Sequence, residues 1–421
     1  MKSDVPSPAV KPVSRIADVD ALRGFALLGI LQVNILAFSS VFYGFPNSDA
    51  ELSFGFNEFV QLIISTIFEM KFYLLFSFLF GYSVTLQMQS AERAGEAFVP
   101  RFLRRQAGLW IVGLLHAVLL FHGDILTTYA VLGVVLLYWR NKPDNTLIKA
   151  AVWLFGLTAL LWLLVGALFW NPDQTDIAEL LAEAQLAHTA YSGSFGAVIM
   201  QHITELQTMW ILLLLIQAPC ALAMFLLGFL AGRHQFLAQP ELYRPYLKPA
   251  IKAAIMIGLP ASVLAALTGL FASGTEWEVF GLALTLVTAP LLTFGIIALM
   301  LRLFGTKHGQ FWRDALAPAG RMALSNYLLQ SLICSFIFYG FGIGLIEKTT
   351  AIVNVLIGLS VFIVQLFVSR WWMRHYYYGP LEWLLRALTI GRWPDFRKPN
   401  ARLGVQQKRR QIYLPAFLLN M

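Results

Sequence analysis

The sequence predicts an all-α, polytopic integral membrane protein: a helical bundle of about ten transmembrane helices with both termini in the cytoplasm. Three observations lead to this fold class. The 421-residue chain is 58% hydrophobic and only 13% charged, whereas soluble domains are about 25% charged. Apolar runs long enough to cross a bilayer recur along the whole chain. Basic residues gather in alternate loops between these runs. One bundle can therefore contain nearly the whole chain.

The predicted spans follow from the requirement that a crossing helix has about 20 mostly apolar residues. The candidates are about 21–42, 60–88, 107–121, 124–140, 147–170, 207–232, 250–272, 279–303, 322–345 and 351–373. The third and fourth are short and only His-Gly-Asp separates them, which predicts a tight hairpin with Gly123 in the turn and Asp124 as a helix cap. Glu69 and Lys71 divide the long second run, so we expect 57–70 in or near the interface and 71–88 to cross. The spacing within DIAELLAEAQLAH, in the loop 171–206, predicts an amphipathic helix.

Loop charges predict the orientation. The loops expected on one side are basic, and the intervening loops are acidic or neutral. The positive-inside rule then places both termini in the cytoplasm, which requires an even number of spans, and a bacterial inner membrane is the expected location. Residues 1–15 are polar and lack the apolar core of a signal peptide, so they predict a disordered cytoplasmic tail. Residues 16–396 form a single membrane domain in this interpretation, and 397–421 form a basic cytoplasmic tail.

Several function classes are disfavoured. The two cysteines, Cys220 and Cys334, lie in separate apolar runs with no metal-type spacing, so we expect no metal. We expect no nucleic-acid partner either, because the basic residues are explained by orientation and by contact with anionic membrane lipids. The sequence contains no phosphate-binding loop and no dinucleotide, zinc-protease or nucleophile-elbow motif in a suitable context.

His116 is the strongest candidate for chemistry, because it lies inside an apolar run. An ionisable side chain at membrane depth is costly unless it faces protein or water, so it is a candidate functional site. A general base or proton relay is one interpretation, and a hydrogen-bonded helix–helix contact is the other. Asp124 is too far along a straight helix to reach it, so a water or a bent hairpin would have to couple them. Glu69, beside Lys71, is either a structural charge at the membrane boundary or a further acid or base near His116.

Polar residues near the predicted cytoplasmic side are candidates for anion binding. Arg23 opens the first span and either snorkels to headgroups or binds an incoming anion, and Asn34 lies about three turns further along that helix. Arg101, Arg104 and Arg105 share one helix face, which suits either a phosphate group or anionic lipid. Asn326 and Gln330, with Arg321 just before them, are either polar contacts between helices or the lining of a ligand entry.

Six stretches of the chain resemble the YeiB-type family of bacterial inner-membrane proteins, which carries a C-terminal domain of unknown function. These stretches are DALRGFALLGILQVNI (20–35), KFYLLFSFLFGYS (71–83), RFLRRQAGLWIVGLLH (101–116), GDILTTYAVLG (123–133), GRMALSNYLLQS (320–331) and YGPLEWLLRALTIG (378–391). The resemblance divides the membrane domain into a family-like part, about 16–205, and the part of unknown function, about 206–396. That family looks related to transmembrane acyltransferases, which move an acyl group from cytoplasmic acyl-CoA to an acceptor at the outer face. One such group has an arginine and a histidine in its first span, at the spacing of Arg23 and Asn34 here, so the arginine is kept and the histidine is replaced.

The resulting hypothesis is an inner-membrane acyltransferase with acyl-CoA as the donor and an envelope sugar or other small molecule as the acceptor. In this hypothesis Arg23, Arg101, Arg104 and Arg105 hold the CoA phosphates, and Asn34 and Asn326 position the thioester. His116 deprotonates the acceptor, and Asp124 or Glu69 orients His116. Lys71, Arg321 and Gln330 complete the predicted binding residues. The alternative is a proton-coupled small-solute transporter or channel that uses His116, Glu69 and Asp124 as a relay; a third is a passive lipid-binding scaffold. Assembly into a homo-oligomer stays open.

Overall fold

The computed structural model describes residues 16–41, 55–169, 177–273 and 275–399, and all regular elements in these ranges are helices. The helices are α1 (Ala17–Ser39), α2 (Phe56–Ile67), α3 (Lys71–Arg93), α4 (Phe98–Leu119), α5 (Leu126–Trp139), α6 (Asp144–Phe169), α7 (Ile177–Tyr191), α8 (Phe195–Leu212), α9 (Ala218–Arg233), α10 (Pro240–Ala253), α11 (Leu259–Phe271), α12 (Glu276–Phe304), α13 (Lys307–Arg321), α14 (Ala323–Phe338), α15 (Ala351–His375) and α16 (Pro380–Ile390). Short π-helical segments, Leu213–Gln217 and Ala254–Gly258, precede α9 and α11. The predicted all-α class is confirmed.

Seven helical segments within the described residues are long and apolar enough to cross a membrane. They are Ala17–Ser39, Phe56–Arg93, Asp144–Leu164, Met209–Arg233, Pro240–Phe271, Glu276–Phe304 and Ala351–His375. Two shorter apolar helices, α5 and α14, lie among them. These segments indicate a membrane protein, whereas the count of ten spans and the orientation stay predictions.

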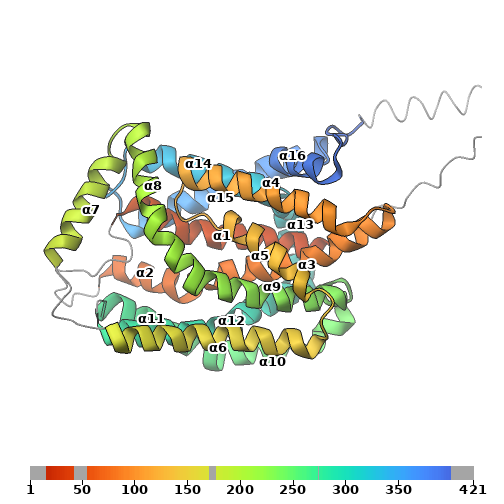
Figure 1. Ribbon diagram of the computed structural model, residues 1–421, viewed down its shortest axis with the longest axis horizontal. Coiled ribbons are helices and arrows are strands. Elements are labelled where there is room, and N and C mark those ends of the chain that lie inside the picture. Colours follow the sequence, from red (N-terminus) through yellow and green to blue (C-terminus); the bar gives the residue numbers. More distant parts are fainter. Residues whose placement is uncertain (1–15, 42–54, 170–176, 274, 400–421) are drawn as a thin grey trace, which may run out of the picture.

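Most helices run along the long axis of the molecule, and α1 lies in the middle of the bundle (Figure 1). The helices α6, α10, α11 and α12 line one long edge in this view, and α4, α14 and α15 lie towards the other. Buried side chains on α1 explain its central place: Leu22, Leu27 and Ile35 are fully enclosed. Helix α7, predicted from the loop 171–206, stands at one end of the bundle, and α16 lies at the other.

Close backbone contact joins α3 to α9. A Cβ atom at Gly228 would clash with the backbone oxygen of Phe78, and a Cβ atom at Gly81 would clash with the backbone oxygen of Phe225. Small residues let membrane helices approach in this way, because packing rather than the hydrophobic effect drives their association in lipid. The crossing fixes α3, which forms part of the wall of the cavity described below.

The second predicted run divides as expected. Helix α2 ends at Ile67 and α3 begins at Lys71, and Met70 between them has a positive φ of 61°. The predicted hairpin is also present, since α4 ends at Leu119 and α5 begins at Leu126.

The predicted tails lie mostly outside the described residues, which exclude 1–15 and 400–421. The first residues of the predicted C-terminal tail, from Arg397, are an exception. The backbone amide of Lys398 donates to the carbonyl oxygen of His375 at 2.8 Å, and Phe396, just before the tail, accepts from the Tyr377 amide at 2.9 Å, so the chain folds back on the end of α15.

Candidate functional site

His116 is buried on α4 and makes one hydrogen bond from each ring nitrogen. Its Nδ1 lies 2.8 Å from Oδ1 of Asp124, and its Nε2 lies 2.8 Å from Oγ of Ser331 on α14. The exposed fractions of the three residues are 1%, 1% and 2%. An acid, a histidine and a hydroxyl in this order form the arrangement that activates a nucleophile in hydrolytic and transfer enzymes.

The bend between α4 and α5 brings Asp124 back to His116. The backbone amides of Leu120 and Phe121 both donate to the carbonyl oxygen of His116, so the helix ends one turn after it. Gly113 leaves room for the returning chain, because a Cβ atom there would approach the backbone nitrogen of Thr127 to 2.6 Å and Oδ2 of Asp124 to 2.9 Å. The sequence left open whether a water or a bent hairpin couples Asp124 to His116. The structure contains the bent hairpin.

Asp124 serves two partners with its two oxygens. Oδ2 accepts a 2.8 Å hydrogen bond from the backbone amide of Thr127 and so caps α5, as predicted. Oδ1 faces His116. An ionised carboxylate only accepts hydrogen bonds, so we assign the ring proton to Nδ1. Nε2 is then an acceptor, and the hydroxyl of Ser331 donates to it.

A cavity of about 440 Å³ approaches this cluster. Tyr327 lines this cavity, and the centroid of the Tyr327 ring lies 4.9 Å from that of His116. Ile125 and Leu126, directly after Asp124, line it too, whereas His116, Asp124 and Ser331 do not. We call this space the arginine cavity, because four arginines lie on its wall: Arg23, Arg105, Arg321 and Arg386.

The arginine cavity is basic and partly organised by hydrogen bonds. Arg23 donates to Asp20 at 2.8 Å and to Ser83 of α3 at 2.5 Å. Asp20 and Glu382 are the acidic residues on the wall, so the lining carries a formal charge of +2. The guanidinium of Arg386 lies 5.2 Å from the Tyr378 ring, and its buried Nε has no hydrogen-bond partner among the described residues. Several guanidinium groups on one wall suit a phosphate ligand.

Glu382 on α16 caps α14. Its Oε1 accepts hydrogen bonds from the backbone amides of Leu324 (2.7 Å) and Ser325 (3.1 Å), and its Oε2 accepts one from the Ser325 hydroxyl (2.6 Å). A negative side chain at a helix N-terminus is stabilising. Burial nevertheless raises the pKa of this carboxyl above 4.5, against the opposing effect of the Ser325 hydrogen bonds. Glu382 thus fixes the start of the helix that carries Tyr327 and Ser331.

Several predicted binding residues lie elsewhere. Arg104 is exposed, and Arg101 pairs with Glu96 at 3.1 Å, so neither joins Arg105 on the cavity wall. Asn34 is half-buried on α1 and lines neither this cavity nor the one described next.

Asn326 and Gln330 contact α15. The Asn326 amide donates to Ser369 at 2.9 Å, and the Gln330 amide donates to Gln365 at 2.8 Å. Gln365 in turn donates to the backbone oxygen of Asn326 at 3.0 Å. Of the two interpretations left open by the sequence, the contacts favour polar association of two helices.

Glu69 and Lys71 line a second, larger cavity of about 1040 Å³, which we call the Lys71 cavity. Lys71 is 2% exposed and donates to the backbone oxygen of Ser65 at 2.9 Å. Three buried polar atoms of other lining residues have no hydrogen-bond partner among the described residues: Trp162 Nε1, Gln217 Oε1 and Ser262 Oγ. His116 is not part of this lining, so the structure does not bring Glu69 and His116 to one site.

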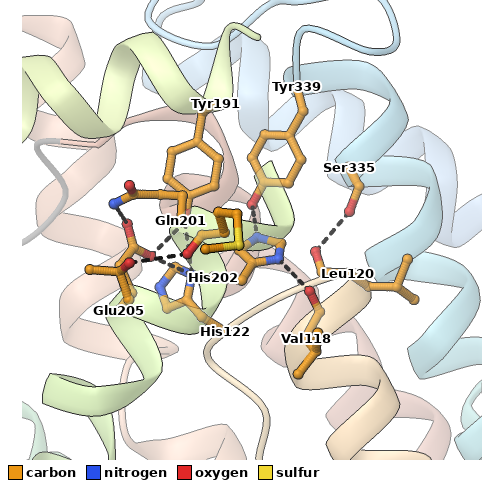
Figure 2. A network of polar contacts seen from close by, with 11 residues as sticks. Val118, Leu120, His122, Tyr191, Gln201, His202, Glu205, Ser335 and Tyr339 are labelled. Carbon is orange, nitrogen blue, oxygen red and sulfur yellow. Dashed lines mark hydrogen bonds and ion pairs between the residues drawn. The ribbon is translucent and has the colours of Figure 1, made fainter. Parts of the chain in front are cut away.

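A third polar cluster lies just beyond the end of α4 (Figure 2). Glu205 of α8 accepts hydrogen bonds from Tyr191 (2.5 Å) and Gln201 (2.8 Å) and pairs with His122 at 2.8 Å. Burial alone would raise the pKa of Glu205, but His122, Tyr191 and Gln201 lower it to about 2. Sequence reasoning gave His122 no role and did not consider Glu205.

His202 belongs to the same cluster. Its Nδ1 donates to the backbone oxygen of Val118 at 3.0 Å, and its Nε2 accepts from the Tyr339 hydroxyl at 3.4 Å (Figure 2). Burial, and then the nearby His122, lower the pKa of His202 to about 4. Neutral His202 therefore links α8 to the end of α4. Among the described residues, no group of three or more histidine, cysteine and acidic side chains could hold a metal ion.

Comparison with known proteins decides the family. The chain is 34% identical over 402 residues to "Uncharacterized protein YxaH" of Bacillus subtilis (strain 168), which covers 91% of this chain and 96% of that protein. It is 28% identical over 416 residues to "Uncharacterized protein YeiB" of Escherichia coli (strain K12), covering 90% and 97%. The chain belongs to the YeiB-type family. Residues 231–392 match a family described as "Protein of unknown function (DUF418)". No solved structure matches the chain.

The candidate site of this YeiB-type protein is built from both parts of the chain. His116, Asp124, Arg23 and Arg105 precede the DUF418 match, whereas Arg321, Ser331, Glu382 and Arg386 lie within it. Sequence reasoning missed the last three. Ser331 lies in a stretch that was singled out, and its spacing of four residues from Tyr327 places both on one helix face. The acid–base partner that makes Ser331 noteworthy, however, comes from a helix more than two hundred residues earlier.

Proposed function

We propose that this protein is a membrane acyltransferase that uses acyl-CoA as donor. The observation that supports this function is the arginine cavity, which is lined by the Tyr327 ring beside His116. Basic groups on the cavity wall and an oriented histidine close to that wall suit a donor that has phosphates at one end and a thioester at the other. The cavity volume of about 440 Å³ falls in the usual range for small-molecule sites.

The arginines would bind the phosphates of the donor. Arg23, Arg105 and Arg321, all predicted from the sequence, share the wall with Arg386. The pantetheine arm would pass the apolar part of the lining, which includes Leu27, Leu109 and Tyr129.

His116 would act as general base. With Nδ1 protonated and held by Asp124, its Nε2, which accepts from the Ser331 hydroxyl, can take a proton from an attacking hydroxyl or amine and return it to the CoA thiolate. The acceptor would be an envelope sugar or another small molecule. In this proposal the chain has about ten spans in a bacterial inner membrane, both termini are cytoplasmic, and the arginine cavity opens to the cytoplasm.

Acetyl-CoA binding to the purified full-length protein, measured by calorimetry, tests the proposal. Arg105→Ala should weaken binding about 10- to 100-fold, because a charge-assisted hydrogen bond is worth about 1.5–3 kcal/mol. Arg104→Ala is the matched control: it removes the adjacent arginine of the same helix, which is exposed and lies off the cavity wall. Absence of binding by the wild-type protein, or equal losses in both variants, would contradict the donor site.

One observation favours the alternative, a small-solute transporter. The two cavities approach each other across α3, where Tyr73 lines the Lys71 cavity and Phe76 lines the arginine cavity. Tyr129 lies at this partition, and its hydroxyl contacts Ser77 at 2.6 Å and the backbone oxygen of Tyr73 at 3.0 Å. Solute flux in proteoliposomes without CoA, increased by Tyr129→Ala, would support transport. Acyl transfer by proteoliposomes that show no solute flux would exclude it.

A further inference from the structure

We infer that Ser331 is the nucleophile of this protein and carries the acyl group as an ester between donor and acceptor. The inference rests on the proposed function and deepens it, because a base that acts directly on the acceptor needs no serine. It makes the reaction a double displacement, in which CoA leaves before the acceptor reacts.

The geometry around Ser331 is that of an activated hydroxyl. Its Oγ lies 2.8 Å from Nε2 of His116, whose other nitrogen is held by Asp124 at 2.8 Å. Because Nδ1 carries the ring proton, Nε2 can only accept, and the Ser331 hydroxyl points its proton at it. A second contact of Ser331, to the backbone oxygen of Tyr327, is 3.4 Å long and therefore weak.

Ser335, one turn later on α14, is a serine whose contacts are purely structural. Its hydroxyl lies 2.8 Å from the backbone oxygen of Ser331 and 2.9 Å from that of Leu120. Both partners are carbonyl oxygens, which cannot serve as a base at neutral pH. The two serines are similarly buried and share a helix face, yet only Ser331 contacts a histidine in the described part of the chain.

The arginine cavity lies close to Ser331, although Ser331 is not on its wall. Tyr327 precedes Ser331 by four residues on α14, lines the cavity and packs against the His116 ring. In this proposal a movement of the Tyr327 side chain lets the thioester reach the Ser331 hydroxyl. The 2% exposure of Ser331 keeps water away from an ester formed there.

The chemistry balances without a further reactant. Ser331 Oγ attacks the thioester carbonyl while its proton passes to His116 Nε2; the carbon–sulfur bond breaks, and the CoA thiolate takes that proton and leaves as the thiol. In the second half, a hydroxyl or amine of the acceptor gives a proton to Nε2 and attacks the ester carbonyl. Ser331 Oγ leaves and recovers the proton, so enzyme and histidine return to their starting state.

A double displacement also fits the position of the site. In this proposal the donor approaches through the arginine cavity, whereas the Phe121 ring links His116 to His122 of the polar cluster, with centroid distances of 6.5 and 5.2 Å. An acyl group stored on Ser331 lets donor and acceptor approach from different directions at different times.

The test uses full-length protein and radiolabelled acetyl-CoA without acceptor. The expected result is release of one equivalent of CoA and a matching covalent label, located by mass spectrometry on the peptide that contains Ser331. Ser331→Ala should lose the label but keep acetyl-CoA binding, and Ser335→Ala should keep both. Ser331→Cys should recover a label that neutral hydroxylamine removes, as expected for a thioester.

Two results overturn the inference and differ in what they say about the proposed function. If Ser331→Ala binds acetyl-CoA and still hydrolyses it at the wild-type rate, transfer is direct, and the acyltransferase proposal stands without Ser331. If the wild-type protein neither binds nor turns over acetyl-CoA, both proposals fail together.

Discussion

His116 and Asp124 are eight residues apart in the chain, and their side chains meet at 2.8 Å because the chain turns back between α4 and α5. A straight helix would hold the two groups about two turns apart. The contact fixes the proton on Nδ1 of His116 and leaves Nε2 available to Ser331. The same carboxylate caps α5, so stability and chemistry depend on one residue and can be separated by a conservative substitution.

Asp124→Asn should abolish activity while leaving the fold almost intact. The asparagine oxygen can still accept from the Thr127 amide, but its NH₂ group now donates to Nδ1 of His116. The ring proton moves to Nε2, which can no longer take a proton from Ser331. Replacement of this kind in soluble Ser-His-Asp enzymes lowers kcat about 10⁴-fold. We expect a loss of roughly 10³- to 10⁴-fold in acetyl-CoA turnover and a Tm within a few degrees of wild type.

Asp124→Ala is the comparison for this prediction. It removes both the orienting contact and the cap, so it should lower turnover similarly and also reduce the free energy of unfolding by roughly 1–3 kcal/mol. Full turnover in Asp124→Asn would show that the pair is only a contact between helices.

Glu382→Gln should tighten acetyl-CoA binding. Glu382 is one of two acids on the wall of the arginine cavity, so its neutralisation changes the formal lining charge from +2 to +3. One extra charge near a phosphate, at the effective dielectric constant of a protein surface, is worth on the order of 1 kcal/mol or more. Calorimetry should therefore give a dissociation constant roughly three- to tenfold lower.

The thermal stability of Glu382→Gln should depend on pH in a defined direction. Burial raises the pKa of Glu382 above 4.5 in the folded protein, so folding favours its protonated form. The contribution of this group to the free energy of unfolding is present below about pH 4.5 and is lost as pH rises through the pKa of the folded protein. Glutamine does not titrate, so the Tm of the variant relative to wild type should rise between pH 4 and 7. If the difference in Tm between variant and wild type does not change with pH, burial is not the main influence on the pKa of Glu382.

His202→Gln should make the protein less sensitive to mild acid. Burial lowers the pKa of His202 from its ordinary value of 6.5 to about 4 in the folded protein, so the unfolded chain binds a proton at a pH where the folded chain does not. The stability that this group contributes is present above pH 6.5 and is lost as the pH falls towards about 4. Wild-type Tm should fall over this window, and the variant, whose amide can still donate to the backbone oxygen of Val118, should show a shallower decline.

His308→Gln is the matched control for this pH experiment, because His308 is exposed on α13. It should leave the slope of Tm against pH at the wild-type value. An unchanged slope in His202→Gln would show that the acid sensitivity arises from other groups.

The all-α class, the apolar helices and the α4–α5 hairpin could be predicted because they depend on composition and on local spacing. His116 and Asp124 could be predicted as candidates for the same reason: a titratable residue in an apolar run is visible in one segment. Arg23, Arg105 and Arg321 were predicted individually as candidates for anion binding, and the structure places them on one wall.

The rest depends on which helices become neighbours, and that information is not local. Arg104 and Arg105 are adjacent in the sequence, yet only Arg105 lines the cavity, because the other helices of its wall pack on that side of α4. Glu382 and Arg386 have the spacing of an ordinary pair on one helix, whereas Glu382 caps a different helix. Ser331 resembles any serine in a membrane helix until His116 is placed beside it.

Gly228→Ala should disrupt the bundle and the arginine cavity together. The added methyl group would clash with the backbone oxygen of Phe78, which cannot move aside as a side chain could. Overpacking of this kind costs about 1–3 kcal/mol or more, so Tm should fall by several degrees.

The matched control is Gly156→Ala on α6, where a Cβ atom meets nothing within 4 Å. It should be neutral or stabilising by up to about 1 kcal/mol, since alanine favours helix more than glycine does. The effect of Gly228→Ala should extend to binding, because α9 supports the cavity wall: Phe225 stacks on Phe80 of α3 with ring centroids 4.6 Å apart, and Phe80 and Ser83 line the cavity. Weaker acetyl-CoA binding at a temperature where Gly228→Ala is still folded would show that the α3–α9 crossing positions the site; unchanged binding would limit its role to stability.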